Sequence, residues 1–299
     1  MGVAFSGLVF LLGASLGSFV NVVAFRVPYG RSIVRPGSRC PACATPIRWY
    51  ANVPVVGWFI VRGRCQACRV PISARYPLVE LVAGLVALAL WRDIAIGLDA
   101  ARHALPSAEL LGRVVVPFVL ETTLAMTLIA HALMDLDWFL LPDVITLPLA
   151  GLGLLAALGD PRGPGFEGAL LGAAIGGLGP WLLMRVYGAA TGRTGLGGGD
   201  WKLLLGIGAW LGVTSLPFVL GAGAVQGLVA ALLFRRDFAR VALPPLPGET
   251  GAEAASDGAN AAVAPVPFRR LMVPFGPFLA VAALEWLFFR DEISRWFAR

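Results

Sequence analysis

The sequence predicts an all-α polytopic membrane protein of about eight transmembrane helices, with a small cytoplasmic four-cysteine insert that binds metal. Three observations support this fold class. Of the 299 residues, 58% are hydrophobic and 14% are charged, whereas soluble domains carry about a quarter charged residues. Several apolar runs approach the roughly 20 residues that a helix needs to cross a bilayer. Two Cys-x-x-Cys pairs interrupt the hydrophobic pattern near the N-terminus.

The N-terminal part divides into a membrane helix and the insert. The run over residues 1–25 has no basic segment before it and no Ala-x-Ala pattern after it, so we expect a retained helix and not a cleaved signal peptide. Residues 26–76 hold nine arginines and no acidic residue. Because cytoplasmic loops carry an excess of Lys and Arg, we expect the insert in the cytoplasm.

Seven further apolar runs complete the expected membrane part. We expect a transmembrane bundle over 77–240, a disordered cytoplasmic linker rich in Pro, Ala and Gly over 241–268, and a last membrane helix with an external tail over 269–299. The runs themselves cover residues 77–91, 110–134, 143–158, 168–187, 203–220, 221–234 and 271–289. The boundary between the sixth and seventh spans, at Gly221, is the least distinct.

The formal net charge of +6 is compatible with nucleic acid binding or with membrane topology. The basic residues are mostly arginines gathered in particular loops, which is the distribution that orients a membrane protein. We therefore expect membrane lipid and no nucleic acid as a partner.

The cysteine pairs predict a structural metal site. Cys40 and Cys43 are separated from Cys65 and Cys68 by 21 residues, slightly more than the common zinc-ribbon spacing, and four thiolates close a tetrahedral Zn²⁺ site. Four thiolates leave no open coordination position, so we expect the metal to stabilise the insert and not to catalyse. Redox dithiols or inert thiols are the alternative.

Candidate catalytic residues lie at the end of the third span and in the turn after it, Asp135, Asp137 and Asp143, and at the start of the sixth span, Asp200. Two crossings separate Asp135 from Asp200, so both return to the cytoplasmic face, and ionisable groups at membrane depth usually mark function. Two close carboxylates share a proton, which is the arrangement of aspartic proteases. Gly197 and Gly199 give the backbone before Asp200 conformational freedom. The alternative that Asp200 and Asp143 are helix N-caps stays open on spacing alone.

Other catalytic schemes lack residues. The chain has two histidines, His103 and His131, which exclude an HExxH site and leave no Ser-His pair. We expect His131 to be hydrogen-bonded within the bundle, although its spacing from Asp135 allows a weak metal pair. Glu80, Arg113, Glu121 and Glu285 lie in or near spans, where we expect pairing with one another.

At this point the residues match a known family: the chain resembles bacterial type IV prepilin leader peptidases, which also process the pseudopilins of type II secretion. The resemblance runs nearly from end to end. It rests on GSFVNVVAFRVP at 17–28, SRCPAC at 38–43, IRWYANVPVVGWFIVRGRCQAC at 47–68, PISARYPLVEL at 71–81, DLDWFLLPDVIT at 135–146 and GLGGGDWKL at 195–203.

The resemblance implies an intramembrane aspartyl endopeptidase of the bacterial inner membrane, with Asp135 and Asp200 as the catalytic pair facing the cytoplasm. It implies that short basic leaders are removed from prepilins and pseudopilins, followed in many members by N-methylation with S-adenosylmethionine. The four-cysteine insert accompanies this bifunctional form. Supporting or substrate-binding candidates, some expected to offset the repulsion between the basic insert and a basic leader, are Asp137, Asp143, Glu80, Gly197, Gly199 and Lys202.

Two functions from other classes remain alternatives at this point. One is a transporter or proton-relay protein in which the aspartates carry protons. The other is a zinc-stabilised scaffold for assembly of a secretion or pilus machine, without catalysis.

Overall fold

The computed structural model describes residues 3–99, 107–192, 197–234 and 273–297. Regular structure in these ranges is helical, apart from two isolated β-bridges in the insert, so the predicted all-helical class is confirmed. The linker predicted at 241–268 lies outside the described residues. The long helices are α1 (Val3–Arg26), α3 (Arg75–Asp99), α4 (Ser107–Trp138), α5 (Asp143–Ala156), α6 (Gly165–Thr191), α7 (Asp200–Leu211), α8 (Leu216–Leu233) and α10 (Gly276–Phe297).

Four stretches of these helices are long and apolar enough to cross a membrane, which makes the chain a membrane protein. They cover Ala4–Tyr29, Gly112–Trp138, Gly165–Thr191 and Val213–Leu233. In contrast, α5 and α7 contain 14 and 12 residues, which is about 21 and 18 Å of helix against a hydrocarbon core of about 30 Å. Each predicted apolar run overlaps a helix, but the predicted number of eight crossings is not confirmed.

The predicted boundary between the sixth and seventh spans at Gly221 is wrong. The helix that begins at Asp200 ends at Leu211, and Gly212 follows with a φ of 80°. A 3-10 turn, η3 (Val213–Ser215), leads into α8, which has proline in its first turn. Gly221 lies inside α8 instead. A glycine with positive φ ends one helix here, and Ser-Leu-Pro begins the next. A hydropathy profile does not detect such a break.

The helices α1 and α3 pack closely because small residues line their contact. A Cβ built on Gly13 would stand 2.5 Å from the Ala87 Cβ, and one on Gly17 would stand 2.6 Å from the Ala83 Cβ. Larger side chains at these positions would separate the two helices, which is the usual reason for small residues at membrane helix interfaces. The pair then packs on α4 through a buried cluster that includes Met134.

Close packing of α7 against α5 and α6 fixes the helix that begins at Asp200. A Cβ on Gly172 of α6 would stand 2.1 Å from the Gly208 carbonyl oxygen of α7, and the reverse substitution meets the Gly172 oxygen at the same distance. On the other side, the Trp210 indole N–H donates to the Leu149 carbonyl of α5 at 2.7 Å. Thus α7 is held between two helices.

A cluster of ion pairs joins the bundle near the middle of α4, away from Asp135. Arg162, in the connection between α5 and α6, pairs with Glu121 at 2.9 Å and with Asp93 at 2.5 Å. Arg290 of α10 donates to the Arg162 carbonyl at 2.6 Å. Glu121 lies about 21 Å from Asp135 along the helix, at 1.5 Å per residue. The cluster thus fixes α3, α4 and α10 to one another.

We expected the ionisable residues in or near the spans to pair with one another, but Glu121 and Glu285 have other partners. Glu121 pairs with Arg162, which lies in a loop and was not among the candidates. Glu285 accepts a hydrogen bond from Gln226 at 2.9 Å, which joins α8 to α10.

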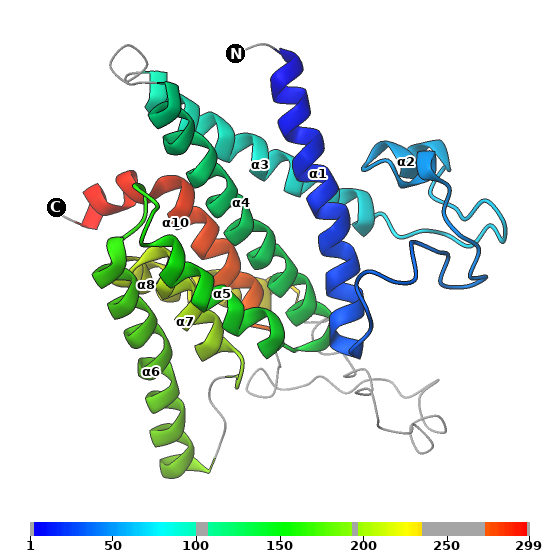
Figure 1. The fold of residues 1–299 in the computed structure, drawn as a ribbon. Helices are drawn as coiled ribbons and strands as arrows, with labels where there is room; N and C mark the ends of the chain where they lie inside the picture. Colours follow the sequence, from blue (N-terminus) through cyan, green and yellow to red (C-terminus); the bar gives the residue numbers. More distant parts are fainter. Residues whose placement is uncertain (1–2, 100–106, 193–196, 235–272, 298–299) are drawn as a thin grey trace.

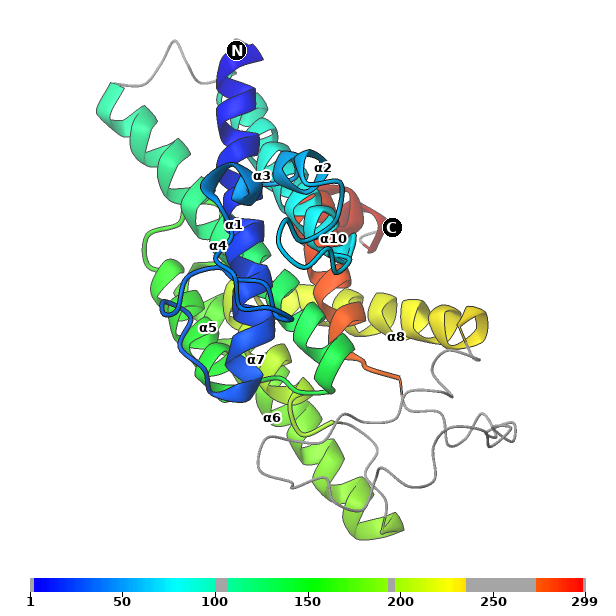
Figure 2. The same ribbon diagram turned by 90° about the vertical axis from the view of Figure 1, so that its right-hand side faces the viewer.

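The insert between α1 and α3 stands to one side of the bundle. Figure 1 shows it, in blue and cyan, on the side of α1 that faces away from α5, α6, α7 and α8, and Figure 2 shows the same arrangement from the side. Its short elements are η1 (Val27–Tyr29), η2 (Trp49–Asn52) and α2 (Val56–Ile60). The insert is therefore attached mainly to the first two long helices.

Candidate active site and metal centre

Asp135 lies in the last turn of α4 and has 6% of its surface exposed. Its carboxyl Oδ2 accepts a hydrogen bond from the Gly276 backbone N–H at 2.8 Å. Gly276 is the first residue of α10, so the carboxyl group meets a helix N-terminus, where free N–H groups and the helix dipole favour negative charge. The N-terminus of the last helix, α10, thus positions the first candidate aspartate, Asp135.

Asp200 is the first residue of α7 and is also 6% exposed. Its Oδ2 accepts a hydrogen bond from the Gly197 N–H at 3.0 Å. A Cβ on Gly197 would stand 2.7 Å from that oxygen, and a Cβ on Gly199 would stand 2.7 Å from the Leu141 Cβ. Both glycines are therefore required for close approach, one to the carboxyl group and one to the link between α4 and α5.

The structure brings the two aspartates together, although 64 residues lie between them in the sequence. Their carboxyl groups are close enough for the charge of Asp135 to act on Asp200. Each accepts one N–H from a glycine, and both are buried. Two such carboxyl groups do not both ionise readily, so the pair is suited to act as one acid and one base.

His131 does not take part in this arrangement, as the sequence led us to expect. Its Nδ1 donates to the Thr127 carbonyl at 2.8 Å, and its Nε2 lies 2.9 Å from the Thr146 hydroxyl, which itself donates to the Pro142 carbonyl at 2.9 Å. Both ring nitrogens are engaged, and His131 has no exposed surface. The residue joins α4 to α5 within the core.

The acidic supporting candidates each have a partner in the chain. Asp137 pairs with Arg75 at 2.5 Å, and Asp143 pairs with Lys202 at 2.5 Å. The second pair ties the start of α5 to the first turn of α7, beside Asp200. Because 55% of the Asp143 side chain is exposed, this carboxylate is also open to a cation from outside.

Glu80 supports the insert. Its Oε2 accepts a hydrogen bond from the Val55 N–H at 2.6 Å. Val55 has a φ of 63° and a ψ of −59°, and the Val56 N–H donates to the Pro54 carbonyl at 2.7 Å. This tight three-residue turn is unusual and costly for a β-branched residue. Glu80 therefore holds a strained turn of the insert against α3.

The four cysteines lie together as predicted. Their sulfur atoms are all within 4.8 Å of one another, with Cys40 3.8 Å from Cys68 and Cys43 3.8 Å from Cys65. Tetrahedral zinc with bonds of about 2.3 Å separates its sulfur ligands by roughly 3.8 Å. The arrangement therefore fits a metal site of four thiolates.

Two copies of one sequence pattern build this metal centre. Residues 39–47 (RCPACATPI) and 64–72 (RCQACRVPI) share Arg-Cys-x-Ala-Cys-x-x-Pro-Ile. Each copy closes with a bridge between its arginine and proline, and the residue after the second cysteine has a positive φ of 56° at Ala44 and 61° at Arg69. This repeat, which the cysteine spacing alone does not reveal, independently indicates two equivalent knuckles.

The environments of the thiols differ. Hydrogen bonds from the Thr45 side chain and backbone lower the pKa of Cys43 to about 6. At Cys68 the Val70 backbone has a lowering effect, but desolvation and hydrogen bonds to the neighbouring thiols raise the pKa to about 11. Crowded thiols resist full ionisation unless a cation balances their charge, so proton and metal compete for this centre.

Gly276 is the site residue that sequence reasoning missed. It lies 141 positions after its partner Asp135. One signal was present, because the alternation of loops places the start of the last span on the same face as Asp135, and Phe-Gly-Pro is typical of a helix start. That pattern, however, does not predict which group accepts a hydrogen bond from the Gly276 N–H.

Most of the chain is similar to known proteins. Residues 11–94 match the family model described as the bacterial peptidase A24 N-terminal domain, and residues 122–232 match the type IV leader peptidase family. The prepilin leader peptidase/N-methyltransferase of Myxococcus xanthus (strain DK1622) is 34% identical over 334 residues, which covers 98% of this chain and 93% of the relative. No solved structure matches the chain significantly.

Two further relatives carry the same name. That of Neisseria gonorrhoeae is 35% identical over 249 residues, with 75% of this chain and 80% of the relative covered. That of Aeromonas hydrophila is 33% identical over 325 residues, with 97% and 92% covered. These matches favour the predicted peptidase over the transporter and scaffold alternatives. The chain belongs to the type IV leader peptidase family.

Proposed function

We propose that the protein is an intramembrane aspartyl endopeptidase that removes short basic leaders from type IV prepilins and pseudopilins. The observation that carries this proposal is the buried pair of Asp135 and Asp200, each of which accepts a glycine N–H. The names of the relatives, prepilin leader peptidase/N-methyltransferase, supply the substrate class.

The chemistry follows from one protonated and one ionised carboxyl group. The carboxylate takes a proton from a water molecule as the water oxygen attacks the scissile carbonyl carbon, and the protonated partner donates its proton to the carbonyl oxygen. Collapse of the tetrahedral intermediate returns a proton to the leaving amine nitrogen. The N–H groups of Gly197 and Gly276 stabilise whichever carboxyl group is ionised, and they hold both in place.

The substrate geometry agrees with a site at a membrane edge. The family resemblance implies cleavage after the glycine that ends the leader, just before the hydrophobic stem of the mature pilin. Such a stem can lie in the membrane while its leader stays in the cytoplasm, and the nine arginines of residues 26–76 support the cytoplasmic side for this end of the bundle. Asp143 is the accessible acidic group for a leader lysine or arginine.

The insert has a structural part in this proposal. Cys40, Cys43, Cys65 and Cys68 would hold Zn²⁺, which would cross-link an insert too small to have its own core. The residues present fit the ion, because their sulfur spacing is that of a four-thiolate site. None of the four residues then acts on the substrate.

We further propose N-methylation of the new N-terminus, with S-adenosylmethionine as the source of the methyl group. The neutral amine uses its lone pair to form the N–CH₃ bond while the S–CH₃ electron pair stays on sulfur, and the resulting ammonium loses a proton to water. An N-terminal amine has a pKa of about 7.7 to 8.0, so a fraction is neutral at pH 7 without a dedicated base.

A reconstituted assay tests the proposal. The full chain in phospholipid vesicles is mixed with a full-length pseudopilin and S-adenosylmethionine, and the products are weighed by mass spectrometry. We expect leader removal and a gain of one methyl group on the mature N-terminus. An uncleaved substrate with a folded, metal-loaded protein would contradict the peptidase function, whereas cleavage without the methyl group would contradict only the second activity.

A further inference from the structure

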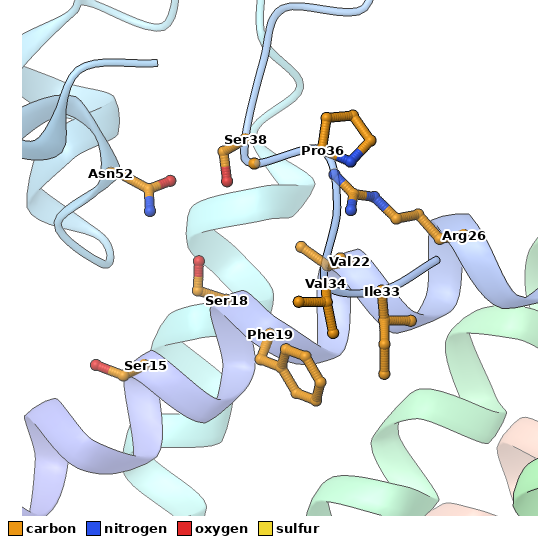
Figure 3. Close-up of a pocket in the computed structure, with 11 residues that line it drawn as sticks. Ser15, Ser18, Phe19, Val22, Arg26, Ile33, Val34, Pro36, Ser38 and Asn52 are labelled. Atoms are coloured by element: carbon orange, nitrogen blue, oxygen red, sulfur yellow. The ribbon is translucent and has the colours of Figure 1, made fainter. Parts of the chain in front are cut away.

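A cavity of about 280 Å³ lies between α1 and the insert, close to the lower end of the range of about 300 to 1,000 Å³ for small-molecule sites. Figure 3 shows that Ser18, Ser38 and Asn52 approach one another at one end, with Ser15 below them, while Arg26 lies at the other end. Phe19, also on α1, is exposed between the two ends. The cavity therefore has a polar end, an apolar middle and a cationic end.

Several polar side chains of this cavity are not bonded to other protein groups. In the part of the chain that the structure describes, the side chains of Ser18, Ser38 and Asn52 have no hydrogen-bond partner within the protein, and those of Ser38 and Asn52 are exposed. One guanidinium nitrogen of Arg26 donates to the Ser32 carbonyl at 3.0 Å, which leaves further donors of its five. None of the described residues that line the cavity is acidic. A ligand with acceptors at one end and a carboxylate at the other would satisfy these groups.

The cavity is at the membrane depth of the aspartates but on the opposite face of α1. Val20 and Ala24 of α1 pack towards Met134 of α4, and Ser18 and Val22 lie roughly 200° around the helix from Val20, at 100° per residue. The depth follows from contacts between helices: Asn21 donates to the Tyr76 carbonyl, and the preceding Arg75 pairs with Asp137. A ligand there is separated from the aspartates by one helix.

We propose that this cavity binds the methyl donor, with the adenosyl group at Ser18, Ser38 and Asn52 and the carboxylate at Arg26. This inference rests on the proposed methylation. An adenosyl group presents ring nitrogens and ribose hydroxyls to the polar end, and its flat ring packs on apolar side chains such as Phe19. The amino-acid carboxylate forms a charge-assisted hydrogen bond with the guanidinium group.

One consequence is that cleavage and methylation are separate in space. The new amine is released beside Asp135 and Asp200 and must pass around α1 to reach the methyl group. The two activities are then separable by substitution, because a change on the cavity face of α1 leaves the face that packs on α4 intact. A shared site would not allow this separation.

Two substitutions test the assignment in the full chain in vesicles. Ser18→Leu fills the polar end, and Arg26→Gln removes the cation. The matched control is Leu16→Phe, which adds bulk at an exposed position of α1 that does not line the cavity. Binding of S-adenosylhomocysteine is measured by isothermal titration calorimetry, and cleavage and the methyl group are measured by mass spectrometry.

We expect Ser18→Leu to weaken S-adenosylhomocysteine binding by more than about tenfold and to remove methylation. Arg26→Gln should weaken S-adenosylhomocysteine binding by about tenfold. Leu16→Phe should bind as the unsubstituted chain does, and Ser18→Leu should still cleave. Unaltered binding by both cavity variants would overturn the proposal. The proposal would also be overturned if Ser18→Leu lost a co-purifying anionic phospholipid but still bound the donor normally. The cavity would then be a lipid site.

A second measurement needs no variant and therefore remains informative if the variants do not fold. The unsubstituted chain is photolabelled with an azido-adenosyl donor analogue, and the labelled peptide is identified. Label within residues 15–38 or at Asn52, prevented by excess S-adenosylhomocysteine, supports the site, and label confined to other peptides overturns it. Absence of any donor binding by the unsubstituted chain would remove both this site and the proposed methylation, but not the peptidase activity.

Discussion

Gly276 offers the sharpest test of the part that α10 plays in the active site. A Cβ at this position would stand 2.8 Å from Asp135 Oδ2 and 3.2 Å from its Cγ. Gly276 does not have a positive φ, so alanine fits the backbone there. The Gly276→Ala substitution therefore acts mainly by pushing the carboxyl group away from the N–H that binds it.

The magnitude follows from the hydrogen bond that is lost. A hydrogen bond to a charged group contributes about 1.5 to 3 kcal/mol, and each 1.36 kcal/mol is a factor of ten in rate. If this bond orients Asp135 in the transition state, kcat/KM for prepilin cleavage should fall about 10- to 100-fold. The assay is cleavage of a purified prepilin in vesicles, followed over time by mass spectrometry.

The control is Gly179→Ala on α6, where a new Cβ meets no atom within 4 Å. This variant should cleave as the unsubstituted enzyme does. Equal rates for Gly276→Ala and the unsubstituted enzyme, with both folded, would refute the idea that the start of α10 positions the aspartate.

Three further predictions concern the insert and the surroundings of Asp200. Cys40→Ser should lower bound zinc, measured by plasma mass spectrometry, from about one ion per chain to nearly none, whereas Ser73→Ala should retain it; full zinc in Cys40→Ser would contradict the four-thiolate site. Glu80→Ala should leave the Val55 N–H without its acceptor and weaken the insert by about 1 to 3 kcal/mol, seen as faster hydrogen exchange at Val55 and Val56; unchanged exchange would argue against this support, and Glu80→Gln should have a smaller effect. Lys202→Met removes a half-exposed ion pair, so stability should fall by no more than about 1 kcal/mol, and a much larger loss on chemical denaturation would show that the pair is part of the core.

The sequence predicted the parts of the site that depend on residue type and on membrane alternation. The cysteine pairs required only their spacing, whereas an even number of crossings placed Asp135 and Asp200 on one face and the family resemblance selected Asp135 over Asp137. His131 was expected to be hydrogen-bonded in the bundle, and its contacts with Thr127 and Thr146 confirm this. Such features follow from local chemistry, so a single sequence carries them.

Other features depend on contacts between distant segments. The bond from Gly276 to Asp135 spans 141 positions, and Glu121 pairs with an arginine in a loop. The break between α7 and α8 was misplaced because Gly212-Val-Thr-Ser lies inside a continuous apolar run, where hydropathy does not change. The glycine contact between Gly172 and Gly208 depends on which helices are neighbours, which composition does not determine.

The proposed mechanism requires Asp135 and Asp200 to act as one unit, and cleavage by three variants tests this directly. Asp135→Asn and Asp200→Asn keep the shape of each side chain but remove the shared proton, and both are compared with the double variant at equal zinc content. We predict that each single variant lowers the rate by at least about a thousandfold, and that the double variant is no slower than the slower single one, because residues that act together are not additive. Nearly full cleavage by either single variant, or losses that simply multiply in the double variant, would contradict the aspartyl mechanism.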